Sequence, residues 1–571
     1  MRTKIQKSLA LFLALAMSFS LLGTTAWATE TVQTEDASTS APAAEEPENN
    51  EEKPTTEAPK ETVEAKETEP ATEAPKAKVK AKETKPAVEE KAEKEKPDQA
   101  AASEGAVSPQ ATDAATSGTR GENLTWTLED GTLTISGTGA MPNWGYYPPP
   151  WRDRCLEIKE VIIEYGVTSI GRSAFNVCRN MTSVTIPESV TTIGESAFDD
   201  CRSLTSVTIP CSVTSIGKGA FFGCESLKSV YISDLAAWCK CDFADGSANP
   251  LSRTTNLYLN GTLVKEVVVP DSVARIGCYA FASYNALTSV TIPDSVTTIC
   301  SGAFDDCVGL TSVTIPDSVT DIGNSVFSGC SNLTSVTISD NITSISSSMF
   351  SYCTRLTSVT IPNSVTSISA YAFSYCRSLA SVTIPSGVTN IGGLAFKGCE
   401  SLTSVKIPEG VTSIGDSVFE SCSSLTNVTI PDSVTSIGDS VFESCSSLTS
   451  VTIPEGVTSI GTGVFCWCDS LKEISVGEDN KEYCSESGVL FDKEKTKLIS
   501  YPGGKDGSTY TIPASVTSIG DSAFSGCSSL TSMMIPASVT SIGGSAFYGC
   551  SSLTSMMIPA SVTSIGGSAF Y

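Results

Sequence analysis

The chain has 571 residues, a formal net charge of −26 at pH 7 and no histidine. An acidic surface repels phosphate backbones and anionic lipids, so nucleic acid and membrane surfaces are disfavoured as partners. Without histidine, the usual general base at neutral pH, Ser–His and Cys–His nucleophile pairs and all His-containing metal sites are excluded. We therefore expect neither an enzyme nor a bound cofactor or metal.

The N-terminal residues have the features of an export signal. Basic residues precede an apolar run over 9–22, and Ala26-Trp27-Ala28 forms a small-x-small cleavage site. No later segment approaches the roughly 20 consecutive apolar residues of a membrane span. We predict a signal peptide over 1–28, cleaved near Ala28, and a mature chain that is secreted or held at the cell surface.

Residues 29–119 consist mainly of Glu, Lys, Ala, Pro and Thr, and Val is their only large aliphatic residue. Such a composition cannot bury enough apolar area to offset the entropy of an ordered chain. We predict a disordered linker that acts as a solvated spacer between the export signal and the folded part of the chain.

The rest of the chain is repetitive. The phrase Leu-Thr-Ser-Val-Thr-Ile-Pro recurs with a period of 23 residues, for example over 310–316 and 356–362. We predict an N-terminal cap over 120–160 and a solenoid over 161–571, with stretched units near 232–268 and 476–511. The last apolar residue of the phrase marks seventeen units, at Ile163, Ile186, Ile209, Ile232, Val269, Ile292, Ile315, Ile338, Ile361, Ile384, Ile407, Ile430, Ile453, Val476, Ile512, Ile535 and Ile558.

One unit, residues 333–355, illustrates the expected local structure. The alternation in Leu-x-x-Val-x-Ile is typical of a short half-buried strand, and the proline that often follows removes a backbone donor. One unit cannot bury its own apolar side, so the units must stack into a parallel solenoid. The positions predicted to face the core are Leu333, Val336, Ile338, Ile342, Ile345, Met349, Phe350 and Cys353.

The pattern Leu-x-x-Val-x-Ile followed by Ala-Phe-x-x-Cys-x-x-Leu resembles the BspA-like class of bacterial leucine-rich repeats. The resemblance covers about residues 120–571. It implies a leucine-rich-repeat solenoid with a curved parallel β-sheet on the concave face and irregular or short helical segments on the convex face. It also implies an exported surface protein that adheres to host matrix proteins or to other cells.

Thirteen of the 21 cysteines share one repeat position. Neighbours in such a column lie one strand spacing apart with parallel Cβ directions, a poor geometry for disulfides, so we predict free buried thiols. The Cys239-x-Cys241 pair lacks a second pair at zinc-site spacing and is weak evidence for a metal. The column comprises Cys178, Cys201, Cys224, Cys307, Cys330, Cys353, Cys376, Cys399, Cys422, Cys445, Cys468, Cys527 and Cys550.

Strand residues that point outward are the candidates for binding, because they form the concave sheet face of this architecture. A polar strip could bind a partner through many contacts; alternatively, Ser and Thr simply fit exposed strand positions. Lys406 and Asn427 interrupt the series and could add specificity. The candidate binding face comprises Ser206, Thr208, Tyr231, Ser289, Thr291, Ser312, Thr314, Ser335, Thr337, Ser358, Thr360, Lys406, Asn427 and Thr452.

Three further segments depart from the repeat. The stretch 257–264 contains an Asn-Gly turn typical of a hairpin, and 489–491 can pair with 498–501. Either insertion could lie at the binding surface or be merely tolerated. The cluster Trp144, Tyr146, Tyr147 and Trp151 could stack on a sugar, but we favour its covering the open N-terminal end of the solenoid.

The sequence thus predicts an exported leucine-rich-repeat binding protein, an adhesin for host extracellular-matrix proteins or other cells. The alternative is a structural cell-surface spacer without a specific ligand. The expected partner is a protein or another cell-surface ligand, and we expect no nucleic acid partner and no transmembrane segment in the mature chain.

Overall fold

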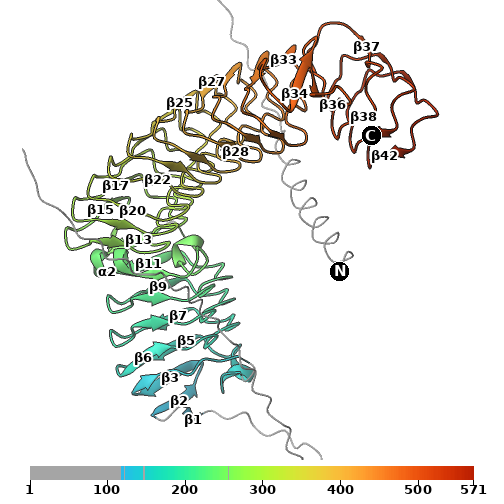
Figure 1. Cartoon of the computed structure of the whole chain (residues 1–571). Helices are drawn as coiled ribbons and strands as arrows, with labels where there is room; N and C mark the ends of the chain where they lie inside the picture. The colour runs from blue at the N-terminus through green and yellow to red at the C-terminus, as the bar shows by residue number, and fades with distance from the viewer. Residues whose placement is uncertain (1–116, 121–122, 146–147, 255) are drawn as a thin grey trace, which may run out of the picture. The chain divides into compact units, whose positions relative to one another are not determined.

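The computed structural model describes residues 117–571, except 121–122, 146–147 and 255. The predicted signal peptide and nearly all of the predicted linker lie outside the described residues. Within the described part, successive turns of the chain stack on one another in chain order, as the colour gradient of Figure 1 shows. The predicted parallel solenoid is confirmed.

The described chain begins with an antiparallel meander of β1 (Ser117–Arg120), β2 (Leu124–Glu129) and β3 (Thr132–Gly137). Strand β3 then pairs in parallel with β5 (Glu160–Ile163), the first strand of the repeats. The connection between them contains β4 (Gly139–Ala140) and a 3₁₀ turn, η1 (Arg152–Arg154). The cap therefore supplies the parallel neighbour that the first repeat strand needs.

Each repeat contributes a first strand from its Ser-Val-Thr segment, and neighbouring first strands run parallel and in register. The central residue of the strand points into the core, as the alternation predicts. We call this series the first strand row. After β5 it comprises β7 (Ser183–Thr185), β9 (Ser206–Thr208), β11 (Ser229–Ile232), β13 (Leu257–Leu259), β15 (Glu266–Val268), β17 (Ser289–Thr291), β19 (Ser312–Thr314), β21 (Ser335–Thr337), β23 (Ser358–Thr360), β25 (Ser381–Thr383), β27 (Ser404–Lys406), β29 (Asn427–Thr429), β31 (Ser450–Ile453), β33 (Glu473–Val476), β37 (Thr509–Thr511), β39 (Ser532–Met534) and β41 (Ser555–Met557).

A second row of short strands follows the turn after each first strand. The sequence analysis assigned no strand to the Ser-Ile segment, which here forms a parallel ladder. We call this series the second strand row. It comprises β4, β6 (Val167–Ile170), β8 (Thr192–Ile193), β10 (Ser215–Ile216), β12 (Asp242–Phe243), β16 (Arg275–Ile276), β18 (Thr298–Ile299), β20 (Asp321–Ile322), β22 (Ser344–Ile345), β24 (Ser367–Ile368), β26 (Asn390–Ile391), β28 (Ser413–Ile414), β30 (Ser436–Ile437), β32 (Ser459–Ile460), β36 (Lys497–Ser500), β38 (Ser518–Ile519), β40 (Ser541–Ile542) and β42 (Ser564–Ile565).

The segment from the second strand to the next repeat consists of tight turns. The amide of Cys353 donates to the carbonyl of Phe350, and that of Leu356 donates to the carbonyl of Cys353. Such bonds close single turns without building a helix. In the described ranges the only α-helix is α2 (Leu235–Lys240), and η2 (Pro250–Arg253) is a second 3₁₀ turn.

The core lies beneath the two strand rows in two clusters of buried residues, a long one over 124–490 and a short one over 489–569. Leu333, Met349, Phe350 and Cys353 are fully buried, as predicted, whereas Val336 is only partly buried. The phenylalanines of successive repeats stack, with ring centroids of Phe327 and Phe350 5.9 Å apart. Burial of one aromatic ring per repeat against its neighbours couples each turn to the next.

Both stretched units contain the predicted hairpins. Strand β13 pairs antiparallel with β14 (Thr262–Leu263), and Asn260 and Gly261 at the turn have φ of 49° and 81°. In the second stretched unit β35 (Val489–Asp492) pairs antiparallel with β36, but also with β34 (Tyr483–Glu486), a strand that the sequence analysis missed. The hairpins extend the neighbouring sheets, but the ladder of first strands breaks at both insertions: among the described strands, β13 does not pair with β15, nor β33 with β37.

Candidate binding face

The first strand row places the predicted outward residues on one face. Thr314 pairs with Thr337, Ser312 with Ser335, and Lys406 with Thr429, each from the neighbouring parallel strand. Because the pairing is in register, equal positions of successive repeats form straight columns. The following members of the predicted face are exposed: Thr208, Tyr231, Thr291, Ser312, Thr314, Ser335, Thr337, Ser358, Thr360, Lys406, Asn427 and Thr452; Ser206 and Ser289 are partly buried.

A hollow of about 700 Å³ lies on this face where Thr314, Thr337 and Thr360 follow one another. The turns after the first strands line one side of it with carboxylates of Asp294, Asp317 and Asp340, all exposed. The sequence analysis named the threonines but missed these aspartates. Their spacing of 23 residues, directly after the strand and its turn, is the signal that could have revealed them.

Elsewhere on the first strand row the chemistry varies. The ring of Tyr231 stacks on that of Tyr258 with centroids 5.0 Å apart, which adds an aromatic patch near the first stretched unit. Met534 and Met557 lie toward the other end of the row and are 64% and 83% exposed. The face is therefore polar in its middle and carries larger side chains toward its ends.

The column cysteines are free and, except for the partly buried Cys550, buried. The Sγ–H of Cys353 donates to the carbonyl of Phe327 at 3.2 Å, and Cys376 repeats the contact with Phe350 at 3.1 Å. Burial raises the pKa of these thiols, to about 12 for Cys422. The column therefore serves packing and backbone hydrogen bonding and leaves no nucleophile at neutral pH.

Metal chemistry has no support in the described ranges, which contain no cluster of three or more His, Cys, Asp or Glu side chains that could hold an ion. Cys239 and Cys241 are both buried, and burial raises the pKa of each thiol to about 12. Zinc binding would have to displace the proton of each thiol, and among the described residues no third His, Cys, Asp or Glu completes a site beside this pair.

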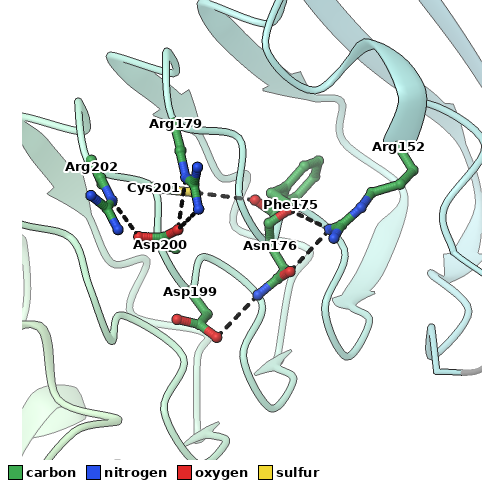
Figure 2. A network of polar contacts seen from close by, with 8 residues as sticks. All are labelled: Arg152, Phe175, Asn176, Arg179, Asp199, Asp200, Cys201 and Arg202. Carbon is green, nitrogen blue, oxygen red and sulfur yellow. Dashed lines mark hydrogen bonds and ion pairs between the residues drawn. The ribbon is translucent and has the colours of Figure 1, made fainter.

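A polar network joins the cap to the first repeats (Figure 2). Arg152 donates to the carbonyl and the side-chain oxygen of Asn176, both at 3.0 Å, and Asn176 donates to Asp199. Asp200 accepts from Arg179 on the preceding turn and from Arg202 on its own turn. The guanidinium groups hold the pKa of Asp200 below its usual value. Most of these contacts join one turn to the next, so the charged side chains of this network have a structural role.

The aromatic cluster of the N-terminal segment packs inward. Trp144 and Trp151 are 7% and 2% exposed, and Trp151 stacks on Phe175 at 5.9 Å. The indole N–H of Trp151 donates to the carbonyl of Ala174 at 2.8 Å. For these two tryptophans, the prediction that they cover the first repeat is confirmed, and neither offers a free face to a sugar.

Two ladders of short parallel strands around a repeating aliphatic and aromatic core define a leucine-rich-repeat solenoid. The model of the BspA type leucine rich repeat region matches residues 153–240, 254–380, 366–487 and 505–571, which is more than half of the chain. The chain belongs to this family. Leucine-rich-repeat families generally act by binding other proteins and not by catalysis.

Several solved structures are similar to the chain. A leucine-rich repeat protein from Eubacterium ventriosum is 23% identical with a TM-score of 0.35, and the match covers 63% of this chain and 97% of that one. One from Bacteroides ovatus is 26% identical with a TM-score of 0.35, covering 79% and 91%. A leucine rich cell surface protein from Faecalibacterium prausnitzii is 26% identical with a TM-score of 0.33, covering 78% and 95%. The search of curated proteins found no match.

In the part of the chain that the structure describes, no helix has both the length and the apolar character needed to cross a membrane.

Proposed function

We propose that the chain is an exported surface protein that binds a macromolecular partner along its first strand row, as an adhesin for extracellular-matrix proteins or for other cells. The observation that carries the proposal is that Thr314, its in-register neighbour Thr337, and Thr360 of the next repeat all line one hollow of about 700 Å³. The columns repeat the same polar chemistry along the array, so many weak contacts with one extended partner can add up.

The charges around the hollow favour a basic partner. Asp294, Asp317 and Asp340 line one side of it, and the whole chain has a net charge of −26. Lysine and arginine side chains of a bound protein would reach these carboxylates at the edge of the strand row, where ionic strength screens them. Binding should therefore weaken as the salt concentration rises.

The test uses the full mature chain and immobilised extracellular-matrix proteins or intact bacterial cells, with affinity measured by biolayer interferometry or cell-binding assays. The triple variant Thr314→Lys, Thr337→Lys, Thr360→Lys places three cations in the hollow and should weaken binding at least tenfold. The matched control is Asp321→Lys, Asn390→Lys, Ser413→Lys, at exposed positions of the second strand row.

Two different outcomes would contradict the proposal, one about the location of the binding face and one about the existence of a partner. If the control triple abolishes binding and the first-row triple does not, the partner uses another face. If no matrix protein or cell saturates the chain at micromolar concentration, the alternative of a structural surface spacer replaces the binding function.

A further inference from the structure

The turn segments between the second strand row and the next repeat form a separate surface, which we call the turn face. Most repeats carry Ser, Gly or Asp at the outer positions of this face, for example Ser325 and Gly329. On two neighbouring turns these positions hold Tyr352, Tyr371 and Tyr375 instead. The repeat pattern alone gives no reason for three aromatic rings at this place.

All three tyrosines have left-handed backbone conformations, with φ of 59° at Tyr352, 61° at Tyr371 and 58° at Tyr375. A bulky side chain is disfavoured there, and glycine or a small polar residue would fit with less strain. Burial does not compensate, because Tyr352 and Tyr371 are 52% and 45% exposed. A strained residue that is not buried indicates a role at the surface.

The three tyrosines surround a hollow of about 430 Å³, the tyrosine hollow. The rings of Tyr352 and Tyr375 stack at 4.8 Å, and the repeat position of Tyr352 is Gly329 one turn earlier. Serine residues of the adjoining turns, among them Ser348, line the rest. The hollow crosses four successive turns, about 14 Å at roughly 4.8 Å per turn.

The hollow carries no unpaired charge among its described lining residues. Its one charged lining residue, Lys397, forms an ion pair with Glu420 at 2.8 Å, and both side chains are only about one-fifth exposed. Hydroxyl groups and aromatic rings remain. This lining suits a neutral ligand with many hydroxyl groups and with apolar C–H faces.

We propose that the tyrosine hollow binds a neutral oligosaccharide. The faces of an aromatic ring are electron-rich, so the C–H groups of a pyranose can stack on Tyr352 and Tyr371. Each serine hydroxyl both donates and accepts, which matches the sugar hydroxyls. A protein anchor instead favours a fully desolvated pocket, whereas this hollow is shallow and open. The site is separate from the first strand row and does not depend on the proposed function.

The test measures binding of cellohexaose, maltohexaose and chitohexaose to the full mature chain by isothermal titration calorimetry. At least one hexasaccharide should bind the wild type. The double variant Tyr352→Gly, Tyr371→Ser introduces the residues of the preceding turn, Gly329 and Ser348. It should weaken that binding at least tenfold. Because the variant relieves two strained positions, its urea midpoint should not fall in proportion to the lost binding.

The control is Phe222→Ser, which removes another aromatic ring of the turn face, 54% exposed and outside the hollow. It should leave hexasaccharide binding unchanged. The proposal is overturned if none of the three hexasaccharides binds, or if the double variant binds like the wild type. A proline-rich peptide is titrated as a second probe. The proposal is also overturned if only this peptide, and no hexasaccharide, binds the wild type and loses affinity in the double variant, because the hollow would then be a peptide site.

Discussion

The strongest test of the inward and outward assignment is the pair Phe350→Ala and Thr337→Ala. Phe350 is fully buried, and its ring stacks on Phe327 at 5.9 Å and on Phe373 at 5.6 Å. Truncation of a buried phenylalanine costs about 3–5 kcal/mol, and loss of two stacked pairs places this site in the upper part of that range. We expect about 4–5 kcal/mol for Phe350→Ala.

The assay is urea unfolding followed by circular dichroism, with hydrogen exchange and mass spectrometry to localise the loss. In a stacked array the damage should be local, so exchange should rise first in the turns next to residue 350. Thr337 is exposed on the first strand row, and its replacement by alanine should cost no more than about 0.5 kcal/mol. Equal losses for the two variants would refute the assignment of the core.

Three other outcomes are expected. In denatured, unreduced mature chain, most of the thirteen column cysteines should react with a thiol reagent; a chain blocked until reductant is added would contradict the column geometry. Cys211 is exposed, and its hydrogen bond to Glu188 raises the pKa of its thiol, so Glu188→Gln should lower that pKa and speed alkylation at pH 8. An unchanged rate would exclude the contact. Asn480→Ala should cost about 3 kcal/mol in urea unfolding, because the fully buried amide donates to the carbonyls of Pro454 and Val457; a cost below about 1 kcal/mol would mean that water replaces it.

The repeat period predicted the first strand row well, because its alternation extends over enough residues to distinguish strand from helix. The second strand row was missed because most of its strands, such as Ser344–Ile345, are only two residues long. A pair of residues carries no periodicity, and its hydrogen bonds come entirely from the neighbouring turns. Only stacking of the repeats makes such a segment a strand.

The candidate site was predicted in part. Outward strand residues such as Thr337 follow directly from the alternation, but the carboxylates beside them lie in turns, where only their 23-residue spacing marks them. The tyrosine hollow was missed for a different reason. Left-handed backbone conformations favour glycine, so the tyrosines at 352 and 371 give no sign in the sequence that their backbone is left-handed. Only the geometry of the turns places the two tyrosines around one hollow.

The stacked aromatic rings of the core form three separate runs, which divide the solenoid into three blocks. One run of rings extends from Trp151 to Phe221, a second from Phe281 to Phe465, and a third from Tyr501 to Phe570. The two stretched units lie between the runs. When the ends are pulled apart, each run can yield as a block at its own force. Extension would then proceed in steps and dissipate load gradually, while the remaining blocks keep their surfaces intact.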